Sequence, residues 1–280
     1  MISGIGSLPH HNVDSALEYV FRHDLPYLPQ LPKLSEQEFM VYQALQGMPG
    51  LELQENNQVV LDTTKLGNWG KAIDESMAKQ SFADYLPTRE SMCAFSPFLF
   101  EIEQRQTKQV KMQLAAPLTC HMVVKDQTGK PLAPEHQRVI TKTILARAKA
   151  MIQAVQERGA EVFFFWDEPA LYAKDPLGSK FILALEELKI VAQGVKSMDA
   201  KVGVHCCSNT EWSKLMALPL DYLSFDTELS LKEVFIDPVA VLKYVKRGGN
   251  FALGLIPTHH RSQIEFATET DRLTKQIAVF

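Results

Sequence analysis

The chain has 280 residues, of which 46% are hydrophobic and 22% charged, and its formal net charge is −4. This length and composition suffice for one large domain with a full apolar core, so we expect a single domain over residues 1–280. The slightly acidic balance argues against nucleic acid as a partner, and no apolar run approaches the roughly 20 residues that a membrane helix needs.

Cysteine usage and the first residues bear on the cellular compartment. Four cysteines are present, too few for a disulfide framework and typical of a reducing environment. The opening Met1-Ile-Ser-Gly-Ile-Gly lacks the basic and apolar regions of a secretory signal peptide. We therefore expect a cytoplasmic protein.

The amino-terminal part predicts a mixture of elements. A strand over 1–7 precedes a helix that Asn12 caps, and a proline-rich extended segment follows. Two alternating runs around Glu55-Asn-Asn predict a hairpin excursion over 50–62. The helices predicted in this part cover 13–23, 35–46, 65–85 and 88–105.

From residue 109 onwards, short apolar strands alternate with helices. The predicted strands cover 110–115, 161–166, 201–205, 221–226 and 251–256. The predicted helices cover 134–158, 177–197, 211–217, 238–246 and 263–279. This alternation implies a parallel sheet built from βαβ units.

Polar residues follow the predicted strands at their carboxyl ends, which is typical of a TIM (β/α)₈ barrel, whose active site lies at that end. These residues are Ser7, Asp167, His205, Asp226 and Thr258. Only seven core strands are predicted and the sequence reaches Phe280 in the seventh helix, so the barrel would lack its last strand–helix unit. A doubly wound open sheet is the alternative.

Strand alternation places His205 and Cys207 on one face, with Asp226 on the same side of the next strand. Imidazole, thiolate and carboxylate are ligands of tetrahedral zinc. A buried strand end with apolar cysteines and a hydrogen-bonded histidine explains the pattern equally well. The same parity directs Lys111 and Gln113 inward, as a satisfied polar layer or as ligand contacts.

Four motifs then suggest a family. They are Gly4-Ile-Gly6-Ser7-Leu-Pro, the segment Lys111 to Thr119, Asp167-Glu168-Pro169-Ala170-Leu171 and His205-x-Cys207. Their order resembles the catalytic barrel of cobalamin-independent methionine synthase and, more distantly, of uroporphyrinogen decarboxylase. In the former family, zinc holds a thiol substrate as its thiolate, the nucleophilic form, and presents it to a methyl donor.

The resemblance implies roles for individual residues. His205 and Cys207 would be zinc ligands, and Asp226 would replace the family's glutamate ligand. Ser7 and Asp167 would hold the amino-acid end of homocysteine, while Gln30 stands where the family has a glutamate that binds the ammonium group. The family's last cysteine ligand lies on an eighth strand, which is not predicted here, so the zinc site could be incomplete.

Further candidates come from position alone. Asp167 and Glu168 are predicted catalytic acid/base residues because they follow a strand at its carboxyl end; loop carboxylates that accept backbone hydrogen bonds are the alternative. His259 follows the seventh strand and is a candidate substrate contact, with a solvated loop as the alternative.

Three functions remain open. The preferred prediction is a zinc-dependent methyltransferase that moves a methyl group from a methyl-folate or a methyl-corrinoid protein to a thiol such as homocysteine. The second is a metal-free, uroporphyrinogen decarboxylase-like enzyme, disfavoured because residues 1–25 lack a basic cluster. The third is a degenerate, non-catalytic barrel that only binds a small ligand, which Gln30 and Asp226 favour.

Overall fold

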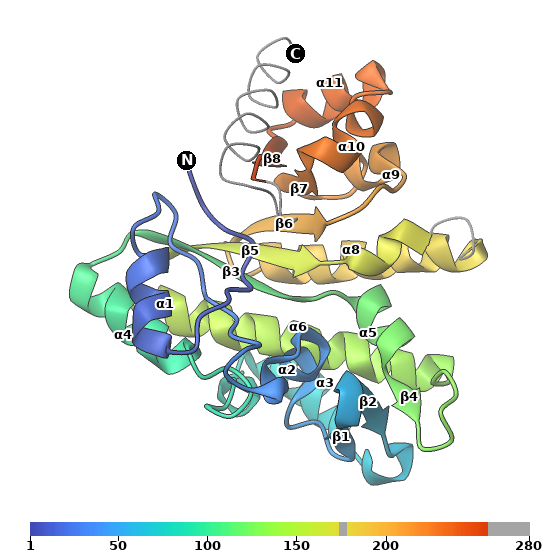
Figure 1. The fold of residues 1–280 in the computed structure, drawn as a ribbon. Coiled ribbons are helices and arrows are strands. Elements are labelled where there is room, and N and C mark those ends of the chain that lie inside the picture. The colour runs from blue at the N-terminus through green and yellow to red at the C-terminus, as the bar shows by residue number, and fades with distance from the viewer. Residues whose placement is uncertain (174–177, 257–280) are drawn as a thin grey trace.

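The fold is built around a parallel sheet of five strands (Figure 1). A computed structural model describes residues 1–173 and 178–256. The strands, in spatial order, are β3 (Gln109–Ala115), β5 (Glu161–Asp167), β6 (Lys201–Cys206), β7 (Tyr222–Asp226) and β8 (Asn250–Gly254). All four neighbouring pairs are parallel, as the βαβ alternation predicts.

Two extended segments continue the sheet beyond β3. Parallel bridges join Tyr27 to Lys111 and Ser7 to Gln30, and the backbone hydrogen bond from Leu28 N to Lys111 O is 2.9 Å long. The seven predicted strands are thus seven parallel extended segments. In the described part of the chain no pairing joins β8 back to the amino-terminal segment, so the closed barrel stays a prediction.

The helices lie close to their predicted positions, with shorter ends. Their bounds are α1 Val13–Val20, α2 Met40–Leu45, α3 Trp69–Lys79, α4 Phe95–Arg105, α5 Pro117–Val123, α6 Pro134–Gln156, α8 Ser179–Lys196, α9 Trp212–Met216, α10 Thr227–Val234 and α11 Pro238–Lys246. Asn12 caps α1 by accepting a hydrogen bond from Ser15 N, as predicted. Neither α5 nor α10 was expected, and the predicted helix over 263–279 lies outside the described residues.

The predicted hairpin is present as β1 (Leu51–Gln54) and β2 (Gln58–Leu61), which pair antiparallel. Its turn holds Asn56 and Asn57 at positive φ, a conformation that asparagine tolerates better than most residues. The short strand β4 (Lys125–Asp126) pairs with β2 in a separate three-stranded sheet. The hairpin is therefore an excursion from the main sheet.

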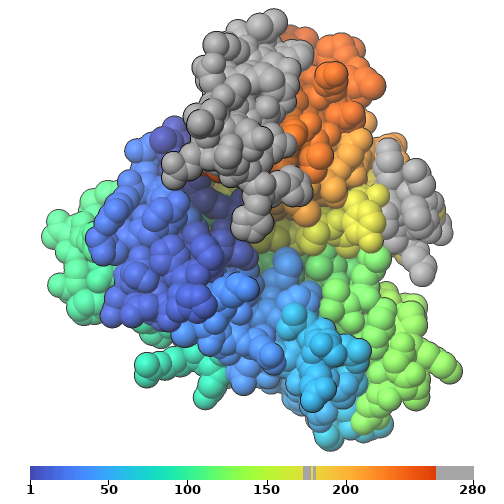
Figure 2. Space-filling view, in the orientation of Figure 1, coloured from blue at the N-terminus to red at the C-terminus, as the bar shows by residue number. Residues whose placement is uncertain are grey.

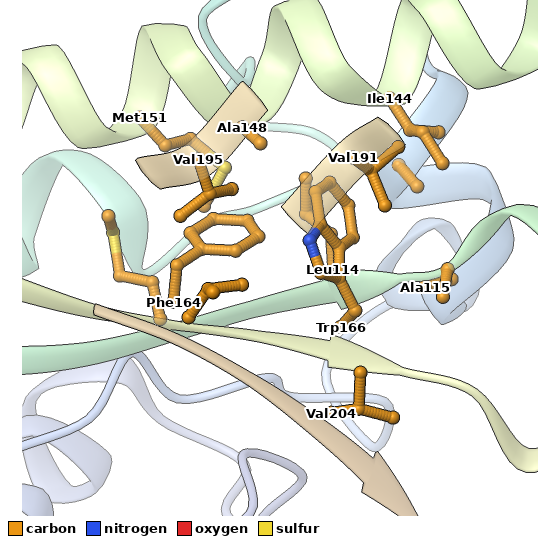
Figure 3. Close-up of a cluster of buried hydrophobic side chains, with 14 of the residues drawn as sticks. Leu114, Ala115, Ile144, Ala148, Met151, Phe164, Trp166, Val191, Val195 and Val204 are labelled. Carbon is orange, nitrogen blue, oxygen red and sulfur yellow. The ribbon is translucent and has the colours of Figure 1, made fainter. Parts of the chain in front are cut away.

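The two faces of the main sheet differ. On the outer face, Phe164 and Trp166 pack against α6 and α8, with Met151 and Val191 among their neighbours (Figure 3). The inner face carries a smaller apolar cluster near the amino ends of the strands, which consists of Leu25, Phe163, Phe165 and Tyr222. Towards the carboxyl ends of β5, β6 and β7 the inner face carries the polar residues Asp167, His205 and Ser224, and this is where the predicted site residues lie.

Candidate functional site

The strand register brings several candidate residues side by side at the carboxyl ends of the strands. Asp167 is the pairing partner of His205, and His205 that of Ser224. Asp167 shares its face with Phe165, and His205 with Gly203, where a side chain would collide with the Phe165 ring. These side chains therefore belong to the inner face.

Asp167 is the candidate carboxylate whose hydrogen bonding is incomplete among the described residues. Its Oδ1 atom is buried and has no hydrogen-bond partner among the described residues. Burial raises the pKa of Asp167 above its ordinary range, and the positive charge of Lys111 opposes this shift. Since buried polar atoms are normally hydrogen-bonded, a group from outside the described structure is expected to meet Oδ1.

Glu168 is fully buried and points away from Asp167, into the amino end of α5. One carboxyl oxygen accepts the Leu118 N–H (2.9 Å) and the other accepts the Thr119 N–H (2.7 Å) and the Thr119 hydroxyl. Burial raises the pKa of Glu168 to about 8, while these hydrogen bonds oppose the shift. Its contacts give it the part of a helix cap supplied by a neighbouring strand.

Lys111 and Gln113 form a polar layer on the inner face. The Lys111 ammonium donates to Ile5 O (2.5 Å) and Gln113 Oε1 (3.0 Å), and it lies 5.0 Å from the centre of the Phe165 ring. Burial lowers the pKa of Lys111, and the charge of Asp167 opposes that shift. No ion pair within 4.0 Å joins Lys111 to Asp167 in the described part of the chain, so their charges interact at a greater distance than that.

His205 has the form of a metal ligand or of a neutral hydrogen-bonding group. Its Nδ1 atom lies 3.0 Å from Ser224 Oγ, and burial, with the nearby charge of Lys111, lowers its pKa to about 4. The imidazole is therefore neutral at pH 7, as zinc binding requires. A second-layer partner on Nδ1, such as Ser224, is also usual for zinc-binding histidines.

The other predicted zinc ligands fit less well. Cys207 as a residue is exposed, but its thiol is partly buried. This partial burial, followed by the charges of Asp167 and Asp226, raises the pKa of the thiol. Asp226 accepts a hydrogen bond from Leu229 N (3.1 Å) and so caps α10. Within residues 1–173 and 178–256, no three His, Cys, Asp or Glu side chains are grouped so as to hold a metal ion. The arrangement does not fit a three-ligand zinc site.

Ser7 and Gln30 contact each other, and the further hydrogen bonds of the Gln30 side chain lead away from Asp167. Ser7 Oγ donates to Gln30 Oε1, and Gln30 Nε2 donates to Glu38 O (2.6 Å) and Gln43 Oε1 (3.0 Å). The amide of Gln30 is thus engaged with the segment that leads into α2, and none of its hydrogen bonds reaches Asp167. Ser7 is exposed at the edge of the sheet. His259 lies outside the described residues.

Two partners were not singled out from the sequence. Thr119 uses its backbone and hydroxyl to hold Glu168, and it lies within the motif that begins at Lys111. Ser224 contacts His205 from the next strand. Parity alone places Ser224 on the inner face, but its pairing with His205 depends on the register between β6 and β7.

Comparisons with known proteins add little. No family model matches the chain, and no curated protein matches it. A solved structure, that of a methyltransferase from Methanosarcina mazei, is similar with 13% sequence identity and a TM-score of 0.48. The match covers 88% of this chain and 70% of that chain. At this identity and TM-score, the similarity establishes neither a family nor an activity for the chain.

Proposed function

We propose that the chain is a methyltransferase whose acceptor is a small amino-acid thiol such as homocysteine, bound at the inner face with its ammonium group on Asp167. The observation that carries the proposal is the buried Oδ1 atom of Asp167, which has no hydrogen-bond partner within residues 1–173 and 178–256. An ammonium group is a strong donor to a carboxylate. Its binding would satisfy an atom whose burial is otherwise costly.

The thiol part of the proposal comes from the order of the strand-end motifs, which resembles the methionine synthase barrel. A thiol held near His205 would lie beside a neutral imidazole, which can accept a hydrogen bond from it; with a pKa of about 4, the imidazole is too weak a base to take the proton itself. The methyl donor, a methyl-folate or a methyl-corrinoid protein, is proposed from the same resemblance.

Zinc remains a prediction from that resemblance. When bound, it would deprotonate the thiol and so supply the nucleophile. No step proposed here depends on zinc, because Asp226 caps α10 and the described residues contain no three-ligand group. The direct test is elemental analysis of chelator-washed protein beside a His205→Ala, Cys207→Ala double variant. About one zinc per chain, lost in the variant, would support the metal.

The test of the acceptor site is calorimetric titration with homocysteine. Asp167→Asn is expected to weaken binding about tenfold or more, because a hydrogen bond to a charged group is lost. Asp14→Asn is the matched control, since Asp14 is exposed in the first turn of α1. Homocysteine binding that is equal in the wild type and in Asp167→Asn would contradict the proposal.

A second candidate function is a binding protein without turnover. The engagement of Asp226 as a helix cap favours it, because a predicted metal ligand is then committed to structure. Methyl-transfer assays with methyl-folate and with a methyl-corrinoid donor separate the two candidates. Homocysteine binding without any methylated product would support the second.

Among the helices of the described residues, none combines the length and the apolar character needed to cross a membrane. The cytoplasmic location and the absence of nucleic acid as a partner stay predictions from composition.

A further inference from the structure

Lys111 is a buried cation on the inner face. Only 6% of the residue is exposed, and its ammonium group holds the carbonyl of Ile5, which is 106 residues away in the sequence. Among the described residues the other buried cation is Arg147, on the separate helix α6. Because a buried charge is costly unless it is compensated, the position of Lys111 calls for an explanation beyond packing.

The contacts of Lys111 join three neighbouring extended segments. Its ammonium group binds Ile5 O in the first segment, and its backbone bonds to Pro26 O and Leu28 N in the second. Gln113, which accepts from Lys111, donates its amide to Leu28 O (2.8 Å). The first segment carries Ser7 at its end, so the hydrogen bond to Ile5 O fixes the chain two residues before Ser7.

Glycine makes this close approach possible. A Cβ atom on Gly6 would lie 2.4 Å from Gln113 Nε2, far inside van der Waals contact. The Gly4-x-Gly6 pattern leaves room for the side chains of Tyr27 and Gln113. The polar layer and the amino-terminal segment are therefore built to fit each other.

The charge of Lys111 also acts on Asp167 of the neighbouring strand, where Lys111 pairs with Phe163 and Asp167 pairs with Ala115. The ammonium group interacts electrostatically with the Asp167 carboxylate without an ion pair shorter than 4.0 Å. A carboxylate that is balanced at a distance keeps its oxygens available, and Oδ1 has no hydrogen-bond partner among the described residues.

We propose that Lys111 is a positioning residue of the acceptor site, which fixes the segment that carries Ser7 and balances the charge of the Asp167 carboxylate without a direct ion pair. This inference rests on the proposed function, because it names the residue that prepares the ammonium-binding group. Lys111 itself touches no acceptor atom. A polar layer that only stabilises the fold is the competing explanation.

The experiment compares Lys111→Met, Lys111→Arg and a control, Lys149→Met. Methionine has a similar length without charge and removes a buried cation, so the variant is expected to fold. Lys149 is matched to Lys111 in chemistry, because it lies 5.5 Å from the Phe82 ring and donates to Ser197 Oγ (2.9 Å), but it is on α6, away from the site.

Two readouts are measured on each variant. The first is calorimetric affinity for homocysteine and for its analogue without the amino group. Lys111→Met is expected to weaken homocysteine binding about tenfold, to change the analogue's affinity much less, and to be rescued by Lys111→Arg. The second is hydrogen exchange at the amides of Leu8 and Gln30, whose acceptors are Gln30 O and Gly6 O; exchange should rise in Lys111→Met alone.

The outcomes separate the two proposals. Equal loss for both ligands without rescue by arginine, or no loss at all, would overturn the positioning role and leave a polar layer. If the wild type binds neither ligand, the proposed function fails, and the exchange data still decide whether Lys111 fixes the amino-terminal segment. Exchange unchanged in Lys111→Met would overturn the inference on its own.

Discussion

Asp167 and Glu168 are adjacent carboxylates that leave β5 on opposite sides. Asp167 lies on the inner face, and its Oδ1 atom has no hydrogen-bond partner in the described part of the chain, whereas both oxygens of Glu168 accept hydrogen bonds at the amino end of α5. The backbone of Glu168 also donates to His205 O (2.8 Å). Glu168 thereby fixes the chain where β5 ends at Asp167, which is a structural role, and the binding role of Asp167 stays a proposal.

The first residue-scale prediction concerns Glu168. Glu168→Gln replaces one acceptor oxygen with an NH₂ group that faces N–H donors, so the free energy of unfolding should fall by about 2 kcal/mol. Urea unfolding followed by circular dichroism measures the change. Glu186→Gln, at an exposed position of α8, is the control and should have no effect. A Glu168→Gln variant as stable as the wild type would show that these hydrogen bonds contribute little.

The second residue-scale prediction concerns the pH dependence of Asp167. Because burial raises its pKa, the folded state binds more protons than the unfolded state above the ordinary aspartate range, so Asp167 lowers stability as the pH rises. Asp167→Asn should therefore gain about 1 kcal/mol at about pH 8 relative to its effect at about pH 4. The gain in stability is limited, because Asp167→Asn also removes the negative charge that interacts favourably with Lys111.

Urea unfolding of the wild type and of Asp167→Asn at both pH values checks this prediction. The expected signature of a binding residue is a variant that is more stable at the higher pH but binds homocysteine less well. An Asp167→Asn variant whose stability relative to the wild type does not rise from the lower to the higher pH would contradict the raised pKa of Asp167.

At the scale of elements, two glycines let the amino-terminal segment pack closely against its neighbours in the sheet. Gly6 lies against Gln113, and Gly4 lies against the ring of Tyr27, where a Cβ atom would be 2.3 Å from Cζ. Overpacking of a filled space typically costs 1–3 kcal/mol. Gly6→Ala should therefore lower the free energy of unfolding by about 2 kcal/mol and weaken the Gln113–Leu28 contact.

Gly70→Ala is the matched control for that variant. Gly70 lies in α3, and an added Cβ there meets only Val139 at 3.5 Å. Alanine has the higher helix propensity, so Gly70→Ala should raise stability by about 1 kcal/mol. Thermal unfolding of both variants distinguishes the two glycines. A Gly6→Ala variant as stable as the wild type would show that Gln113 can move aside without cost.

The elements differ in how far the sequence predicts them. Apolar alternation predicts the strands and the long helix α6 because these signals are local. Helix α5 has only seven residues, and its amino end is stabilised by Glu168 from β5, a contact that no local pattern reveals. Helix α10 could have been found, because Asp226 and Glu228 form an amino-terminal helix signal; Asp226 was instead interpreted as a zinc ligand.

The same distinction applies to the candidate site. Strand parity places Lys111, Gln113 and His205 on the inner face because side chains alternate with a period of two. The partners of these residues depend on which strands are neighbours and in what register. The contacts between Lys111 and Ile5 O, and between His205 and Ser224, belong to this second class.

At the scale of the whole molecule, one apolar core spans both halves of the chain. The main cluster of buried residues runs from Ala16 in α1 to Tyr244 in α11. In the ribbon the blue amino-terminal segments lie on the β3 side of the sheet, and the orange elements α9 to α11 lie beyond β6 (Figure 1). The space-filling view shows the blue amino-terminal region in contact with the central yellow region (Figure 2).

This continuity predicts that the chain unfolds in one cooperative transition. The amino-terminal segments pair with β3, β3 pairs with β5, and the pairing continues to β8, so no group of strands can separate without exposing core residues. Circular dichroism and tryptophan fluorescence should give the same urea midpoint. The three tryptophans, Trp69, Trp166 and Trp212, report on α3, β5 and α9.

Trp69→Phe and Trp212→Phe supply the internal controls, because each removes the tryptophan fluorescence signal of one element, α3 or α9. In each variant the fluorescence midpoint should coincide with that of circular dichroism, even if the variant is less stable than the wild type. An earlier fluorescence transition in Trp212→Phe alone would show that the helices around Trp69 unfold separately. The single-domain prediction would then be wrong, since the helices around Trp69 would have a stability independent of the sheet.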